Sequence, residues 1–145
     1  MTHTSAAVVL ATAIVLTAGG CERAPRTDLT KVRGLVVYQA NGEKAASYSV
    51  DAILRMAYCQ CDPQIVRRIF PSATYSSDAP MWKGSRLGIL SFDDGTTKRI
   101  EISYYGGFFG VVGEKGTYDF PKATRDEWDR LIQGPFQEPD ASRTK

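Results

Sequence analysis

The chain has a single histidine among its 145 residues, and that histidine, His3, lies in an N-terminal segment that we expect to be removed. Without an imidazole, the remaining chain cannot form a Ser/His/Asp triad, a Cys–His catalytic pair or a histidine metal site. The chain also lacks a large excess of charge of either sign, because its 18 basic and 16 acidic residues leave a formal net charge of +2. This charge is too weak and too evenly spread to indicate a nucleic-acid partner. We therefore expect no enzyme activity, no cofactor and no metal.

Long apolar runs are scarce as well, and the one at residues 6–18 is shorter than the roughly 20 residues that a membrane-spanning helix needs. An apolar run of this length near the N-terminus, followed by small residues, is typical of a cleavable export signal. The first five residues contain no Lys or Arg, which is unusual for such a signal. We nevertheless predict a signal peptide at residues 1–20.

The end of this run, Leu16-Thr17-Ala18-Gly19-Gly20-Cys21, resembles the lipobox of bacterial lipoprotein precursors. The resemblance covers only the leader, and Ala18 stands where the pattern usually has leucine. It implies that the thiol of Cys21 is acylated and anchors the protein in the cell envelope. Glu22 then implies the outer membrane rather than retention at the inner membrane. The alternative is ordinary secretory cleavage at the same boundary, which would release a soluble protein.

The chain after the leader divides into three parts. Residues 21–30 are polar and contain one proline, so we expect a short lipid-anchored tether. Residues 31–133 form the predicted single domain. Residues 134–145 contain two prolines and few apolar side chains, which predicts a flexible tail.

Alternating and helical apolar patterns predict an α+β domain with an antiparallel β-meander, two short helices before it and one C-terminal helix packed on one face. Strands are expected at 32–40, 43–48, 86–92, 97–105, 108–112 and 117–120, with turns at Asn41-Gly42 and Asp93-Asp94-Gly95. Helices are expected at 49–58, at 62–70 after an Asp-Pro start, and at 124–132 after a Thr124–Glu127 capping box. Turn chemistry also explains Asp93 and Asp94 better than a catalytic carboxylate pair does.

Once Cys21 is assigned to the lipid, Cys59 and Cys61 remain as a pair in a chain bound for an oxidising compartment. Inside a helix these two side chains would point about 200° apart, so a disulfide requires the preceding helix to end by Tyr58. Three interpretations stay open. The pair forms a structural or intermolecular disulfide, or it remains as buried free thiols, or it serves redox or copper(I) chemistry.

The segment 103–110, with two tyrosines, two phenylalanines and three glycines, is the most unusual stretch for binding. Adjacent residues of a strand face opposite sides, so either the sheet is covered on both faces or one aromatic row is exposed. We name Tyr105 and Phe109 as a candidate interaction surface, together with Trp82. Arg67 and Arg68 are either a solvated helix face or a contact for acidic partners or lipid head groups.

These features predict an exported, lipid-anchored envelope protein that binds another macromolecule, as an inhibitor or immunity-type protein. This role rests on analogy with small bacterial lipoproteins. The alternative is a structural or assembly accessory lipoprotein. We expect its contacts to be the membrane, through the anchor, and a protein partner in the envelope.

Overall fold

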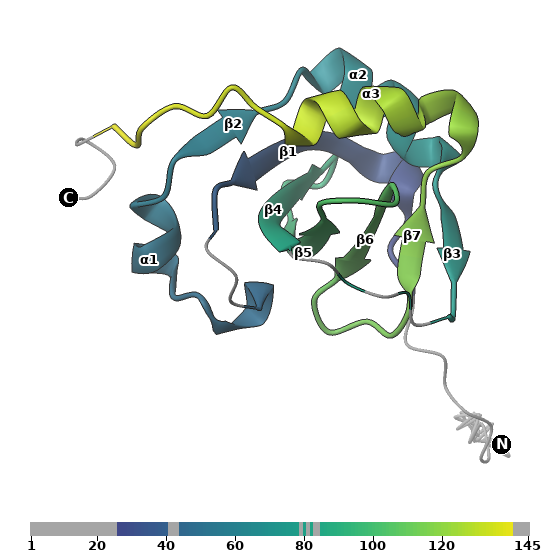
Figure 1. The fold of residues 1–145 in the computed structure, drawn as a ribbon, viewed down its shortest axis with the longest axis horizontal. Coiled ribbons are helices and arrows are strands. Elements are labelled where there is room, and N and C mark those ends of the chain that lie inside the picture. The colour runs from purple at the N-terminus through teal and green to yellow at the C-terminus, as the bar shows by residue number, and fades with distance from the viewer. Residues whose placement is uncertain (1–25, 41–43, 79, 81, 83–84, 141–145) are drawn as a thin grey trace, which may run out of the picture.

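The computed structural model describes residues 26–40, 44–78, 80, 82 and 85–140, and Figure 1 shows their arrangement. The elements are η1 (Leu29–Lys31), β1 (Val32–Tyr38), η2 (Ala45–Ser47), α1 (Val50–Leu54), β2 (Tyr58–Gln60), α2 (Pro63–Ile69), η3 (Phe70–Ser72), β3 (Thr74–Ser76), β4 (Ser85–Phe92), β5 (Thr97–Ser103), β6 (Phe108–Val111), β7 (Thr117–Asp119) and α3 (Lys122–Ile132), where η denotes a 3-10 helix. The predicted leader, the acylated Cys21 and the Asn41-Gly42 turn lie outside the described residues.

Within these ranges, the strands form one seven-stranded sheet in the order β2-β1-β4-β5-β6-β7-β3, and every neighbouring pair is antiparallel. Strands β4 to β7 follow one another as a meander. The Asp93-Asp94-Gly95 turn is confirmed between β4 and β5, and the Asp94 carboxylate there accepts a hydrogen bond from the Thr96 backbone N–H at 2.9 Å. The predicted α+β class with an antiparallel sheet is therefore confirmed.

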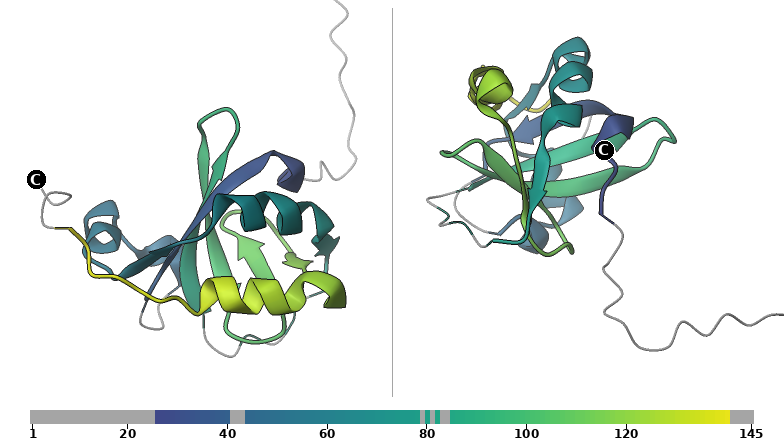
Figure 2. Two further views of the ribbon diagram at one scale, coloured as in Figure 1. Left: turned by 90° about the horizontal axis from the view of Figure 1, so that it is seen from above. Right: turned by 90° about the vertical axis from the view of Figure 1, so that its right-hand side faces the viewer.

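One face of the sheet carries the main core and is covered by α2, η3 and α3 (Figures 1 and 2). At its centre lie four aromatic side chains, each less than 2% exposed: Phe70, Phe109, Phe120 and Trp128. Their ring centroids lie 4.5–5.8 Å apart, which is the usual range for packed aromatic pairs. This aromatic centre joins the first half of the chain to the last helix.

The opposite face of the sheet is covered by the chain at one end and open at the other. Over β1 and β4, a second cluster of buried side chains packs η2 and α1 against the strands, and it consists of Ala40, Ala45, Ile53 and Leu87. Over β5, β6 and β7, this face instead carries a groove. The sheet therefore has one face devoted to the main core and one face that is only partly occupied by the chain itself.

Three elements differ from the sequence-based expectation. The segment expected to be a return strand at 43–48 contains η2, and β1 pairs with β2 and β4 instead. The first helix ends at Leu54 rather than Tyr58, because Tyr58 pairs with Tyr38 of β1. The expected loop at 72–80 contains β3, which forms the outer edge of the sheet against β7. In each case pairing across the sheet outweighs the local pattern.

The last helix also begins earlier than expected. Helix α3 starts at Lys122 with Pro121 as the N-cap residue, so the predicted Thr124–Glu127 capping box is wrong. The Thr124 hydroxyl instead lies 2.9 Å from the hydroxyl of Ser72, and the Glu127 carboxylate binds Arg68. The predicted apolar side of α3 is confirmed, because Trp128 and Ile132 are buried and Leu131 packs against the core.

The folded domain extends beyond the predicted 31–133 at both ends. Leu29 and Thr27, from the predicted tether, are each only 7% exposed. In the predicted tail, Gln137 exchanges backbone hydrogen bonds of 2.8 and 2.9 Å with Tyr58, and Phe136 packs against the core. Backbone pairing with the edge strand β2 orders this tail segment, and the apolar pattern of the sequence carries no sign of it.

Candidate binding groove

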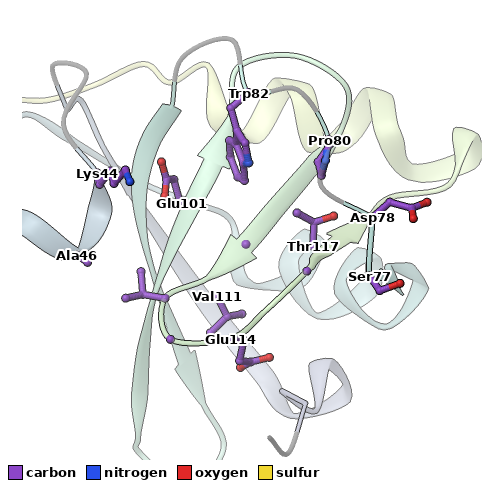
Figure 3. Close-up of a pocket in the computed structure, with 14 residues that line it drawn as sticks. Lys44, Ala46, Ser77, Asp78, Pro80, Trp82, Glu101, Val111, Glu114 and Thr117 are labelled. Carbon is purple, nitrogen blue, oxygen red and sulfur yellow. The ribbon is translucent and has the colours of Figure 1, made fainter. Parts of the chain in front are cut away.

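The groove lies on the partly occupied face of the sheet, between η2 and the segment that follows β3 (Figure 3). Its volume is about 540 Å³. Lys44 and Ala46 line one side, and Asp78, Pro80 and Trp82 line the other. Strands β5, β6 and β7 supply the floor, so the position of its floor residues is set by the sheet register rather than by loops.

Three floor residues form a row across these strands. Glu101 of β5 is paired with Gly110 of β6, and Phe109 is paired with Tyr118 of β7. Continuing that register by one residue places Gly110 opposite Thr117. Because neighbouring strands are about 4.8 Å apart, Glu101 and Thr117 lie about 10 Å from each other along the row.

The indole of Trp82 lies over the middle of this row. A Cβ atom built on Gly110 would be 3.7 Å from Cζ2 and 3.8 Å from Cη2 of Trp82. The same indole packs edge-on against Phe108, with ring centroids 4.9 Å apart. The indole therefore packs at van der Waals distance over Gly110, and Figure 3 shows it between Glu101 and Pro80.

The groove combines exposed apolar surface with polar groups that lack partners. Trp82 and Val112 are each 37% exposed, and both line it. Glu101 is half-buried, and no hydrogen bond or ion pair to its carboxylate is formed within the described residues. Thr117 is only 4% exposed, and its hydroxyl likewise has no hydrogen-bond partner in the described part of the chain. Because buried polar groups are normally satisfied, this combination is typical of a binding surface.

Comparisons with protein-family models, with curated proteins and with solved structures gave no match. Within the described ranges, no helix is long and apolar enough to cross a membrane. Over the same residues, no group of three or more His, Cys, Asp or Glu side chains is placed to hold a metal ion.

Of the three aromatic residues predicted to form an interaction surface, the structure places only Trp82 in the groove. The prediction that Phe109 is a surface residue is wrong. Its side chain is fully buried in the main core and stacks on Tyr118, with ring centroids 5.3 Å apart. Its neighbour Phe108 faces the groove side and is covered by Trp82. Tyr105 is 69% exposed but lies in the turn after β5, and it does not line the groove.

The two predicted arginines lie on α2, away from the groove. Arg67 is exposed, as a solvated helix face requires. Arg68 instead binds the Glu127 carboxylate through both of its terminal nitrogens, and the Nη1–Oε1 distance is 2.7 Å. Hydrogen bonding to Arg68 holds the pKa of Glu127 below its usual range. Arg68 thus links α2 to α3.

The sequence did not single out Glu101, Gly110 or Thr117. Glu101 belongs to the wet face of a predicted alternating strand, and glycine at 110 fits a bend or a close backbone approach equally well. Only the register of β5, β6 and β7 brings the three residues together. Register depends on pairing between strands, which the pattern of one strand does not specify.

A second polar cluster ties the predicted tether to the lower end of the groove. The Glu114 carboxylate accepts hydrogen bonds from the hydroxyls of Thr27 and Tyr118, the latter at 2.6 Å, and lies 3.6 Å from the Lys98 ammonium. Burial opposes ionisation of Glu114, but the hydrogen bonds from Thr27 and Tyr118 outweigh it and lower its pKa. Since Glu114 also lines the groove, the segment leading to the predicted lipid anchor is fixed beside it.

Cys59 and Cys61 are free thiols in the structure, and both are buried. Tyr58–Gln60 is a strand, so the two residues share a face and enter the main core together instead of pointing apart. Burial, followed by the neighbouring Cys59, raises the pKa of the Cys61 thiol to about 12. Of the three interpretations of the sequence, the buried free thiols match this geometry.

We expect a thiol assay to show this state directly. With Cys21 acylated or replaced by serine, the native protein should react slowly with a thiol-specific reagent at neutral pH, because the thiolate is the reactive form. Denaturant should then release two reactive thiols. The pair would instead be oxidised if the denatured, unreduced protein yielded no thiols until a reductant was added.

Proposed function

We propose that this protein is a lipid-anchored protein of the bacterial cell envelope whose domain binds a protein partner in the groove. The observation that supports binding is the placement of exposed Trp82 and Val112 beside Glu101 and Thr117, whose polar groups lack partners in the described residues. A partner would remove the apolar surface from water and supply the missing polar contacts. Both effects favour the bound state.

The location rests on the lipobox resemblance at Cys21. Four residues separate this cysteine from Arg26, where the described chain begins, so the two are five Cα–Cα steps apart. Fully extended, these five steps span at most about 18 Å. An acylated Cys21 would therefore hold the domain close to the membrane surface, within reach of other envelope proteins. An inhibitor or immunity-type role is the narrower form of this proposal, in which the partner is an envelope-active toxin or hydrolase.

Replacing Trp82 with alanine tests binding by the groove. We expect affinity capture from an envelope extract to recover a partner with the wild-type protein and at least about tenfold less of it with Trp82→Ala, because interface tryptophans often contribute 2 kcal/mol or more. Tyr105→Ala is the matched control, since it removes a more exposed aromatic side chain that lies outside the groove. Mass spectrometry would identify the captured protein.

Equal capture by wild-type protein and Trp82→Ala would contradict binding in the groove. Loss of capture with Tyr105→Ala alone would move the interface to the turn after β5. If the captured protein were a component of an envelope assembly rather than a toxin or a hydrolase, the alternative role of structural or assembly accessory would be favoured.

Replacing Cys21 with serine tests the anchor. We expect the wild-type protein to fractionate with membranes and to enter the detergent phase, whereas Cys21→Ser should be recovered in the soluble fraction of the envelope. Stable anchoring needs more than one acyl chain, and each buried CH₂ contributes about 0.8 kcal/mol, so loss of the acylated cysteine removes the whole attachment. Full membrane association of Cys21→Ser would contradict lipidation at this residue.

A further inference from the structure

We propose that the groove recognises a positively charged side chain of its protein partner, an arginine or a lysine, between the carboxylate of Glu101 and the indole of Trp82. This inference rests on the proposed function and specifies its partner. The occupant is an exposed basic segment of another polypeptide.

The charges around the groove favour a cation. Among its described lining residues, Glu101 and Asp78 are negative with no described ion-pair partner, and Lys44 is positive. Glu114, the third carboxylate, is already neutralised by Lys98 at 3.6 Å. Asp119 lies on the same face of β7 as Thr117; burial raises its pKa, the charge of Arg125 opposes this shift, and the charge of Asp78 adds to it. The described lining of the groove therefore holds three carboxylates and one ammonium group, and this excess of negative charge is complementary to a basic side chain.

The geometry supplies both contacts that such a side chain prefers. Glu101 is half-buried and is paired with Gly110, and the Trp82 indole lies at van der Waals distance over the same glycine. A cation within about 6 Å of an indole ring is attracted to its face, and a charge-assisted hydrogen bond to a carboxylate is about twice as strong as a neutral one. One guanidinium or ammonium group at this position can make both contacts.

Thr117 provides an independent indication that a ligand is accommodated here. Thr117 is only 4% exposed and is therefore more than nine-tenths buried. Its side chain points to the groove face, because the side chain of its neighbour Tyr118 points into the core. The hydroxyl has no partner in the described residues. It lies about 10 Å from Glu101 along the row, which is the length of about three residues of an extended chain. A basic segment crossing the strands would therefore place a backbone carbonyl near this hydroxyl.

Two blocked pentapeptides test the charge requirement, one with a central arginine and one with the neutral isostere citrulline. The mature protein in detergent micelles has two indole N–H signals by nuclear magnetic resonance, from Trp82 in the groove and Trp128 in the core. We expect the arginine peptide to shift the Trp82 signal in a saturable and salt-sensitive manner and to leave the Trp128 signal in place. The citrulline peptide should bind at least about tenfold more weakly.

Glu101→Gln should weaken binding of the arginine peptide by about tenfold, while Glu138→Gln, which removes an exposed carboxylate outside the groove, should leave it unchanged. An unshifted Trp128 signal would show that each variant is folded. Equal binding of the two peptides, no shift of Trp82 at ~10 mM peptide, or unchanged binding by Glu101→Gln would overturn the inference. If capture of an envelope partner still depended on Trp82 in any of these cases, the proposed function would stand without it.

Discussion

Replacing Phe109 with alanine should lower the free energy of unfolding by about 4 kcal/mol, because truncation of a buried phenylalanine typically costs 3–5 kcal/mol. Phe109 is fully buried in β6, between β5 and β7. Its ring contacts Phe70, Phe120 and Trp128 at 5.5–5.8 Å and stacks on Tyr118 at 5.3 Å. Removing it would leave a cavity between the sheet and both covering helices, which cannot collapse without moving all of them.

Denaturant unfolding followed by tryptophan fluorescence measures this effect, since Trp128 lies against the deleted ring. Tyr105→Ala is the control, because it removes an aromatic side chain that is 69% exposed in the same segment, and it should change stability by less than about 0.5 kcal/mol. Similar losses in the two variants would contradict the assignment of Phe109 to the core. A small loss in Phe109→Ala alone would do the same.

The strands around Phe109 also show how much of the sheet can be predicted from the sequence. Alternation in the strand expected at 97–105 predicted a buried side with Ile100, Ile102 and Tyr104. Both isoleucines are fully buried, but Tyr104 is 36% exposed, because β5 ends at Ser103. The Asp-Gly turn that joins β4 to β5 has its own local chemistry, so it was predictable as well. Alternation in 108–109 predicted that Phe108 and Phe109 face opposite sides but not which of them faces the helices. That choice depends on register with β5 and β7, which are separate segments of the sequence.

The segment between β1 and α2 was less predictable, because its local pattern conflicts with its tertiary partners. The helical stripe that begins at Val50 leaves Val50 63% exposed, and the helix stops at Leu54. From Tyr58 the chain instead pairs with the outer edge of β1. Without β2, the outer edge of β1 would have backbone N–H and C=O groups without partners. Pairing with β1 therefore outweighs the weak tendency of this short segment to form a helix.

The groove was predictable only in part for the same reason. Trp82 could be named from the sequence as an aromatic residue outside a predicted strand. Its functional setting comes from Gly110 beneath it and from the row that joins Glu101 to Thr117 across three strands. These residues are neither charged clusters nor motifs in the sequence. They become a site because the sheet aligns a carboxylate, a bare backbone position and a hydroxyl on the face that the helices do not cover.

Replacing Gly116 with alanine should lower the free energy of unfolding by about 3 kcal/mol and should act mainly on the edge of the sheet that borders the groove. Gly116 has a φ angle of +83°, which L-residues adopt at a cost of roughly 1–2 kcal/mol. An added Cβ would also lie 2.5 Å from the Ser76 carbonyl oxygen and 2.8 Å from the Tyr75 ring. Ser76 is paired with Thr117, so the backbone of β3 would have to move away from β7.

Gly113→Ala separates the two causes, because Gly113 has a similar φ of +89° and an added Cβ there would meet nothing within 4 Å. It should therefore lose only about 1 kcal/mol. Hydrogen exchange should show faster opening of β3 amides in Gly116→Ala than in Gly113→Ala, and partner capture should fall in the former, because β3 leads into the side of the groove that contains Asp78 and Trp82. Equal stability losses in the two variants would show that the close approach of β3 to Gly116 is not what holds this edge in place.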